Sequence, residues 1–167
     1  EYRQRRTWRH GVSAGRWRTA GVALVMLAAV VLGAGQLGLL AGTPPTDLGV
    51  HQGRLKAPAS TPNSVSSQAS LHSGHPMQQQ AMISPLPLQG TPAEAIGRLR
   101  ALVQAMPGAE VVTQRADYLY VRFHSHWLGF VDDAEFWVDP LARVIQLRSA
   151  SRLGASDLGV NRARIER

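Results

Sequence analysis

The stretch FVDDAEFWVDPLARVIQLRSASR, residues 130–152, decides the fold. Asp139 followed by a proline is typical of the start of a type I turn, so the residues on either side are expected to pair as antiparallel strands. If Asp139 lies opposite Val144, then Glu135 lies opposite Arg148 and the alternate positions form an apolar face. A shift of one residue would mix charged and apolar side chains on both faces. The pattern therefore predicts a hairpin in this register.

Four acidic residues gather on the first strand of this hairpin, although the chain has only 11 acids and a formal charge of +7. We expect Glu135 and Asp133 to face Arg148 and Arg152 on an exposed side of the sheet, where each pair contributes roughly 0.2–1 kcal/mol. Asp132 instead shares the core-facing side, where a carboxylate needs a donor such as a loop hydroxyl or an arginine of the C-terminal tail. We interpret Asp132 as a structural hydrogen-bond anchor, with a ligand or catalytic role as the alternative.

A helix is expected directly before the strands. Thr91 is a typical N-cap, Pro92 suits the first helical turn, and Glu94 completes a capping box. Apolar residues then recur at helical spacing up to Pro107-Gly108, namely Ile96, Leu99, Val103 and Met106. Strand-like runs follow at 110–114, 118–126, 130–138 and 144–151. One helix on an antiparallel sheet is the economical arrangement, so residues 91–167 are predicted to form a small α+β domain.

The segment 43–90 is rich in proline, serine, glutamine and glycine, which predicts an extended chain. It contains His72, His75 and Met77, whose imidazole and thioether groups are ligands that copper accepts. Their spacing matches no strong metal motif, so they are weak candidates and we predict neither a metal nor a cofactor. The sequence also lacks a nucleophile elbow, a phosphate-binding loop and a zinc-protease motif, which argues against an enzyme.

An uncharged run precedes this segment, since no charged residue occurs from Thr19 to Thr46. As a helix, residues 20–41 would span roughly 33 Å, enough to cross a hydrocarbon core of about 30 Å. We therefore predict a transmembrane helix over residues 19–42. A cleaved signal peptide, hinted at by Arg5-Arg6, is the competing interpretation.

The charges around this run predict its orientation. Residues 1–18 contain six arginines and one glutamate, so they are expected to remain as a basic tail in the cytoplasm, close to anionic lipid head groups. The chain after the run would then lie in the periplasm of a bacterial inner membrane. That part carries 12 basic and 10 acidic residues and is nearly neutral, which argues against nucleic acid as a partner.

Small residues four positions apart occur within the predicted membrane helix. The pairs are Ala29 with Gly33 and Ala34 with Gly38, and such pairs allow another helix to approach closely. Gln36, near the outer end, would gain from a polar partner. The chain has no cysteine, which excludes disulfides and thiolate metal sites.

Several runs of the chain resemble a known family. The run FVDDAEF (130–136), followed by RSASRLGASDLGVNR (148–162) with Asp157 and Asn161, resembles the bacterial and plastid family labelled domain of unknown function 1499. DLGV at 47–50 and TPNSVSSQ at 61–68 extend the similarity. The resemblance implies no enzyme activity, because that family has no established chemistry. Its members usually have cysteines around the Pro-Asn stretch, where this chain has Pro58 and Ser64, so no thiol role is expected.

These observations favour a non-catalytic, single-pass accessory subunit of a larger inner-membrane complex of the photosynthetic or respiratory kind. Its partners would be other membrane protein subunits. The alternative is a periplasmic module or enzyme that binds a small anion or a metal through Asp132 and the loop Arg148–Arg152.

Overall fold

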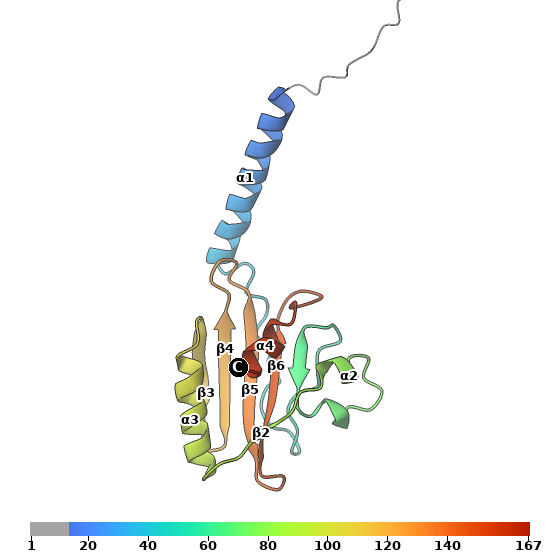
Figure 1. Cartoon of the computed structure of the whole chain (residues 1–167), viewed down its shortest axis with the longest axis vertical. Coiled ribbons are helices and arrows are strands. Elements are labelled where there is room, and N and C mark those ends of the chain that lie inside the picture. The colour runs from blue at the N-terminus through green and yellow to red at the C-terminus, as the bar shows by residue number, and fades with distance from the viewer. Residues whose placement is uncertain (1–13) are drawn as a thin grey trace, which may run out of the picture.

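The protein has two parts, a single helix and a small domain (Figure 1), and the computed structural model describes residues 14–167. The helix α1, Ala14–Gln36, stands apart from the domain except at its C-terminal end. The domain is an antiparallel sheet with helices, so the predicted α+β class is confirmed. The prediction of a basic tail falls mostly on residues 1–13, which lie outside the described residues.

Six strands form the sheet, in the order β1-β6-β5-β4-β3, with β2 also paired to β6. Their bounds are β1 Ser64–Ser66, β2 Leu86–Pro87, β3 Ala109–Gln114, β4 Tyr118–His124, β5 Val131–Asp139 and β6 Val144–Ser151. The predicted register is confirmed, because Asp139 pairs with Val144 and Glu135 with Arg148. His126 and Phe130 were expected in strands but lie in the turn between β4 and β5. The turn is closed by a hydrogen bond from the Gly129 amide to the Ser125 carbonyl.

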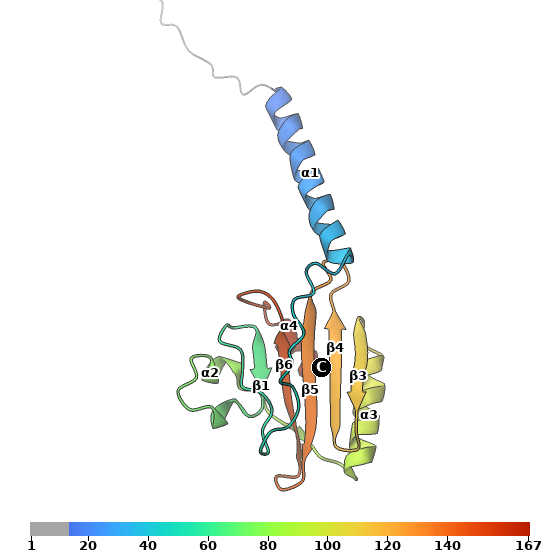
Figure 2. The ribbon, with the colours of Figure 1, turned by 180° about the vertical axis from the view of Figure 1, so that it is seen from behind.

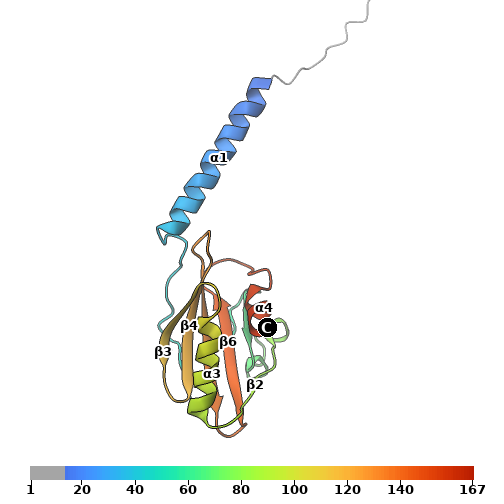
Figure 3. The ribbon, with the colours of Figure 1, turned by 60° about the vertical axis from the view of Figure 1, so that its left-hand side comes forward.

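Two helices cover one face of the sheet (Figure 3): α3, Pro92–Gln104, and α4, Val160–Ile165. The predicted capping box is confirmed, since the side chains of Thr91 and Glu94 each accept a hydrogen bond from the other residue's backbone amide. Ile96 and Val103 of α3 are buried in the core, together with apolar residues of β4, β5 and β6. Two short helices, η1 Ala69–Leu71 and α2 Gln78–Ala81, lie between β1 and β2 in the chain.

The opposite face is covered by the chain that follows α1, and we call residues 43–60 the strap (Figure 2). An apolar cluster holds it to the sheet, formed by Leu48, Val50, Leu55, Tyr118, Tyr120 and Trp137. The expectation of an exposed acidic face is therefore wrong: Asp133 and Glu135 are only 2% and 0% exposed. The segment 43–90, expected to be an extended chain before the domain, also adds β1 and β2 to the sheet.

The helix α1 begins and ends earlier than the predicted span of residues 19–42. It ends at Gln36, and Gly38 lies beyond it with a φ of 76°. The predicted pair of Ala34 and Gly38 therefore does not form on the helix, because the two residues are not on one helical face. Ala29 and Gly33 both lie on the exposed surface of α1. The helix is long and apolar enough to cross a membrane, and helices of signal sequences share these properties.

Candidate functional site

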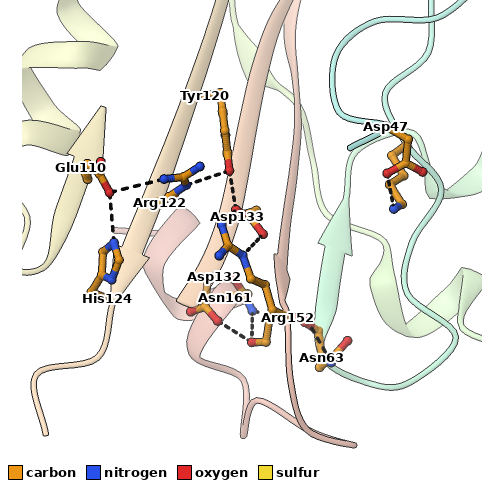
Figure 4. A network of polar contacts seen from close by, with 12 residues as sticks. Asp47, Asn63, Glu110, Tyr120, Arg122, His124, Asp132, Asp133, Arg152 and Asn161 are labelled. Carbon is orange, nitrogen blue, oxygen red and sulfur yellow. Dashed lines mark hydrogen bonds and ion pairs between the residues drawn. The ribbon is translucent and has the colours of Figure 1, made fainter. Parts of the chain in front are cut away.

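Charged and hydroxyl-bearing side chains gather between the sheet and the strap. This group, which we call the polar layer, consists of Tyr118, Tyr120, Asp133, Glu135, Arg148 and Arg152. It arises because side chains alternate between the two faces of a strand, so every second residue of β4, β5 and β6 faces the strap. Four of the predicted site residues meet here, whereas Asp132, Asp157 and Asn161 lie on the face covered by α4. Figure 4 shows Tyr120, Asp133 and Arg152 of the polar layer, and Asp132 and Asn161 of the other group.

Asp133 and Arg152 form a buried ion pair in the polar layer. The Nε and Nη2 atoms of Arg152 each donate to one carboxylate oxygen of Asp133 at 2.8 Å, a two-pronged geometry that arginine favours. The hydroxyl of Tyr120 donates to the same carboxylate at 2.6 Å. The hydrogen bond with Asp133 raises the pKa of Arg152, so this guanidinium remains charged in the pair.

Glu135 is the most deeply buried charge of the layer. One carboxylate oxygen, Oε1, accepts hydrogen bonds from the Gly49 amide at 2.6 Å and from the Tyr118 hydroxyl at 2.7 Å. The other, Oε2, is buried without a hydrogen-bond partner among the described residues. Burial raises the pKa of Glu135, although these two hydrogen bonds and the charge of Arg148 oppose the shift.

Arg148 does not form the predicted ion pair with Glu135, although the two residues are opposite each other in the sheet. Its Nε instead donates to the carbonyl oxygen of Ala57 in the strap at 3.0 Å. The strap thus supplies a neutral partner that the sequence pattern could not indicate. Burial lowers the pKa of Arg148, while the negative charges of Glu135 and Asp133 oppose this effect.

The two tyrosines of the layer are functional residues that the sequence reasoning missed. Tyr118 and Tyr120 hydrogen-bond the carboxylates of Glu135 and Asp133, and burial raises the pKa of both phenols, which therefore remain protonated donors. Their alternation on β4, beside the acidic strand, was the signal available in the sequence.

Asp132 lies on the other face and is held by both kinds of donor that the sequence predicts. The Ser151 hydroxyl donates to Oδ1 at 2.5 Å, and the Nη2 atom of Arg164, in the C-terminal helix, donates to Oδ2 at 2.7 Å. The Arg164 guanidinium also lies 4.3 Å from the centre of the Phe123 ring. Both carboxylate oxygens are therefore occupied, which favours the interpretation of Asp132 as a structural anchor.

Asn161 joins four segments of the domain beside this anchor. Its amide nitrogen donates to the carbonyl of Asn63 at 3.2 Å, to Ser151 Oγ at 3.1 Å and to Asp157 Oδ2 at 2.9 Å. Its amide oxygen accepts from the hydroxyl of Ser149. Burial acts to raise the pKa of Asp157, but hydrogen bonds from Asn161 and from the Gly159 amide outweigh it and lower that pKa.

A cleft of about 720 Å³ opens between the strap and β6. Its lining includes Arg148, Arg152 and Asp133 from the sheet and an ion pair from the strap, in which Lys56 Nζ lies 2.6 Å from Asp47 Oδ1. The hydrogen bond from Lys56 lowers the pKa of Asp47. The lining thus contains the ion pairs Lys56–Asp47 and Arg152–Asp133, together with Arg148, whose guanidinium is bonded to a backbone carbonyl.

The weak metal candidates lie in the loop around η1 and α2. The Nδ1 atom of His75 accepts a hydrogen bond from the Met77 amide at 3.2 Å, while Nε2 of His72 is buried without a partner among the described residues. Burial lowers the pKa of His72. Within residues 14–167, no group of three or more His, Cys, Asp or Glu side chains is arranged to hold a metal ion.

The end of α1 is fixed to the turn between β4 and β5. Gln36 Nε2 donates to the carbonyl oxygens of His126 at 3.0 Å and Trp127 at 3.1 Å. A Cβ atom on Gly35 would lie only 2.5 Å from the carbonyl oxygen of Leu128, so glycine is required for this close approach. The polar partner expected for Gln36 is therefore provided by the chain itself.

The fold and this site define a small α+β domain that is preceded by one apolar helix. Most of the buried charges of the domain form ion pairs with each other. Residues 54–167 match the model of a family described as protein of unknown function (DUF1499), and the chain belongs to this family. The predicted resemblance is thereby confirmed. No curated protein and no solved structure matches the chain.

Proposed function

We propose that the protein is a non-catalytic, single-pass accessory subunit of a larger complex of the bacterial inner membrane. The N-terminal arginines lie in the cytoplasm beside anionic lipid head groups, and the domain lies in the periplasm. The partners are other membrane protein subunits.

The observation that carries this proposal is the junction of α1 with the domain. The surface of α1 is apolar along its membrane-length window and is almost wholly exposed, so it lacks a covering partner within residues 14–167. Its C-terminal end is nevertheless bonded through Gln36 to the domain. A helix fixed in this way holds the domain in one orientation at the bilayer, which suits a subunit better than a freely tethered module.

The pairing of the buried charges supports a non-catalytic role. Acid or base catalysis requires a titratable group within reach of a substrate. Asp132 is occupied by Ser151 and Arg164, and Asp133 by Arg152 and Tyr120. These carboxylates stabilise the fold and are not available for proton transfer.

The test uses the small-residue face of α1. Gly33→Leu adds a bulky side chain where Ala29 and Gly33 would admit a neighbouring helix, and Gly21→Leu is the matched control on the same helix. A Cβ atom at either glycine meets nothing within 4 Å, so neither change disturbs the chain itself. After mild detergent extraction, the wild type and Gly21→Leu should migrate in a large complex on native gels, and Gly33→Leu should not. Migration of the wild type as a free monomer under all mild conditions would contradict the proposal.

A second candidate function is binding of a small anion in the cleft. Arg148 is buried, lines the cleft, and uses only Nε in a hydrogen bond with the described residues. Lys56, Arg148 and Arg152 are balanced by Asp47, Asp133 and Glu135, which is why this function ranks second. The version of this alternative that relies on Asp132, for a metal or for catalysis, has less support because both oxygens of that carboxylate are occupied.

Titration with inorganic phosphate and with acetate tests anion binding. The wild type and the control Arg143→Gln, changed in the exposed hairpin, should be stabilised against heat, whereas Arg148→Gln should not respond. Near-UV circular dichroism shows whether Arg148→Gln retains its fold. Equal responses of all three proteins would exclude this site.

A further inference from the structure

The helix α1 is long enough to cross a membrane, but its uncharged part leaves little excess length. Arg18 is the last charged residue before the apolar run, and Gln36 is the last residue of the helix. At 1.5 Å per residue, the distance between them is roughly 27 Å, less than the hydrocarbon core of about 30 Å. The apolar run continues as non-helical chain through Leu37 and Leu39, both highly exposed. The outer boundary of the hydrocarbon therefore lies at the level of these residues or beyond.

One edge of the domain lies beside the C-terminal end of α1 (Figure 1), and we call it the α1-side edge. It consists of residues 125–130, between β4 and β5, residues 152–159, between β6 and α4, and Val160, the first residue of α4. Because the strands are antiparallel, the end of β4, the start of β5 and the end of β6 lie at the same edge. The hydrogen bonds from Gln36 to the backbone at His126 and Trp127 place this edge beside the end of the helix.

Large apolar side chains are concentrated on the α1-side edge. Trp127 is 69% exposed and Leu158 is 92% exposed. Phe130, Leu153 and Val160 are also exposed. Clustered exposed apolar residues mark an interaction surface, and tryptophan is enriched where protein meets the membrane interface. Trp17 occupies the corresponding position at the other end of α1.

The two charged residues of this edge each have partners within the domain. Arg152 is bonded to Asp133, and Asp157 accepts hydrogen bonds from the Gly159 amide and Asn161. Arg152 is therefore neutralised by an ion pair, whereas Asp157 keeps its negative charge and is held by hydrogen bonds from neutral groups. The opposite edge of the sheet, residues 115–117 and 139–143, is different in character, because it carries Arg115, Asp117, Asp139 and Arg143.

We propose that the α1-side edge rests in the lipid of the leaflet from which α1 emerges, with Trp127 and Leu158 inserted at the head-group level. This surface lies at the level where the uncharged part of α1 ends. The partner is the bilayer itself, and the inference rests on the proposed anchoring by α1. It predicts that the domain lies directly against the membrane instead of projecting from it.

The chain offers a matched pair of positions for a test. Leu158 and Leu141 are 92% and 95% exposed, and they lie on opposite edges of the sheet. Because the chain has no cysteine, Leu158→Cys and Leu141→Cys can each be labelled at a single site. Leu24→Cys, in the middle of α1, reports insertion of the helix. Both leucines of the pair are almost fully exposed, so neither substitution disturbs the core.

Each labelled full-length chain is reconstituted into vesicles of phosphatidylcholine and phosphatidylglycerol. Quenching of the fluorophore by lipid spin-labelled near the head group is compared with quenching by iodide present on both sides. The Leu158→Cys label should be quenched several-fold more by the lipid than the Leu141→Cys label, with the opposite order for iodide. A label at Trp127→Cys should behave like the one at Leu158→Cys.

The Leu24→Cys label separates the two possible failures. If it is shielded from iodide while the labels at 158 and 141 respond alike, α1 is inserted and the inference about the edge is overturned; a protein partner would then be the remaining occupant. If the Leu24→Cys label is open to iodide, the anchoring itself fails and the inference fails with it.

Discussion

Replacing Asn161 with alanine is expected to destabilise the domain by about 2–6 kcal/mol. The side chain is fully buried and bonds the carbonyl of Asn63 and the hydroxyl of Ser149, which belong to different segments of the chain. The truncation leaves both buried groups without this partner, and each such loss costs about 1–3 kcal/mol. Since whole domains are stable by only about 5–15 kcal/mol, this single change removes a large fraction of the total.

Urea unfolding of the full chain in mild detergent, followed by near-UV circular dichroism, measures the effect. With a slope of about 2 kcal/mol per molar urea, a loss near 4 kcal/mol lowers the midpoint by about 2 M. Val160→Ala is the control, because this half-exposed residue precedes Asn161 in α4. It should cost less than about 1 kcal/mol. A midpoint for Asn161→Ala equal to that of the control would refute the view that this amide holds α4 and the β1 segment on the sheet.

Three further predictions concern the polar layer and the junction. Burial raises the pKa of Glu135 above its ordinary value of 4.5, so the folded state holds this proton more tightly than the unfolded state does. Between the ordinary and the raised pKa, the stability of the wild type relative to Glu135→Gln should therefore fall by about 1.4 kcal/mol for each unit of rising pH. Urea unfolding at a series of pH values measures this difference, and a difference that does not change with pH would contradict the prediction. Arg152→Ala should cost about 3–5 kcal/mol in the same unfolding assay because it leaves Asp133 buried and unpaired, whereas removal of both charges should cost less than Arg152→Ala alone. Gly35→Ala should loosen the contact of α1 with the domain and speed proteolysis of the chain between them, while Gly21→Ala should cleave like the wild type.

The register of the hairpin of β5 and β6 could be predicted to the residue because its pattern is local. A proline-containing turn and strict alternation leave one register in which charged and apolar side chains separate, and Asp139 pairs with Val144 as expected. The donors of Asp132 were predictable for the same kind of reason. A carboxylate on the core-facing side needs specific partners, and Ser151 and Arg164 supply them.

The strap could not be predicted, because its contacts depend on few apolar residues in a segment of loop-like composition. Leu48, Val50 and Leu55 are separated by two and five positions, which sustains neither a strand nor a helical period, yet they pack against the tyrosines of β4. This covering turns an expected solvent-exposed acidic face into the buried polar layer. It also gives Arg148 a backbone partner, the carbonyl of Ala57, in place of the expected carboxylate. Such long-range contacts leave no periodic signal in the sequence.

The junction also bears on whether α1 is retained as an anchor or removed as a signal peptide. A signal peptide needs no fitted contact with the mature domain, because it is cleaved after targeting. Here, a Cβ atom on Gly35 would clash with the Leu128 carbonyl, and one on Gly129 would lie 2.4 Å from the Gly35 carbonyl oxygen. The edge beside the end of α1 also carries the exposed apolar side chains of Trp127 and Leu158. We therefore favour a helix α1 that is retained as a membrane anchor. Two observations support this interpretation: the close contacts between Gly35 and the turn at residues 128–129, and the apolar edge beside the end of the helix.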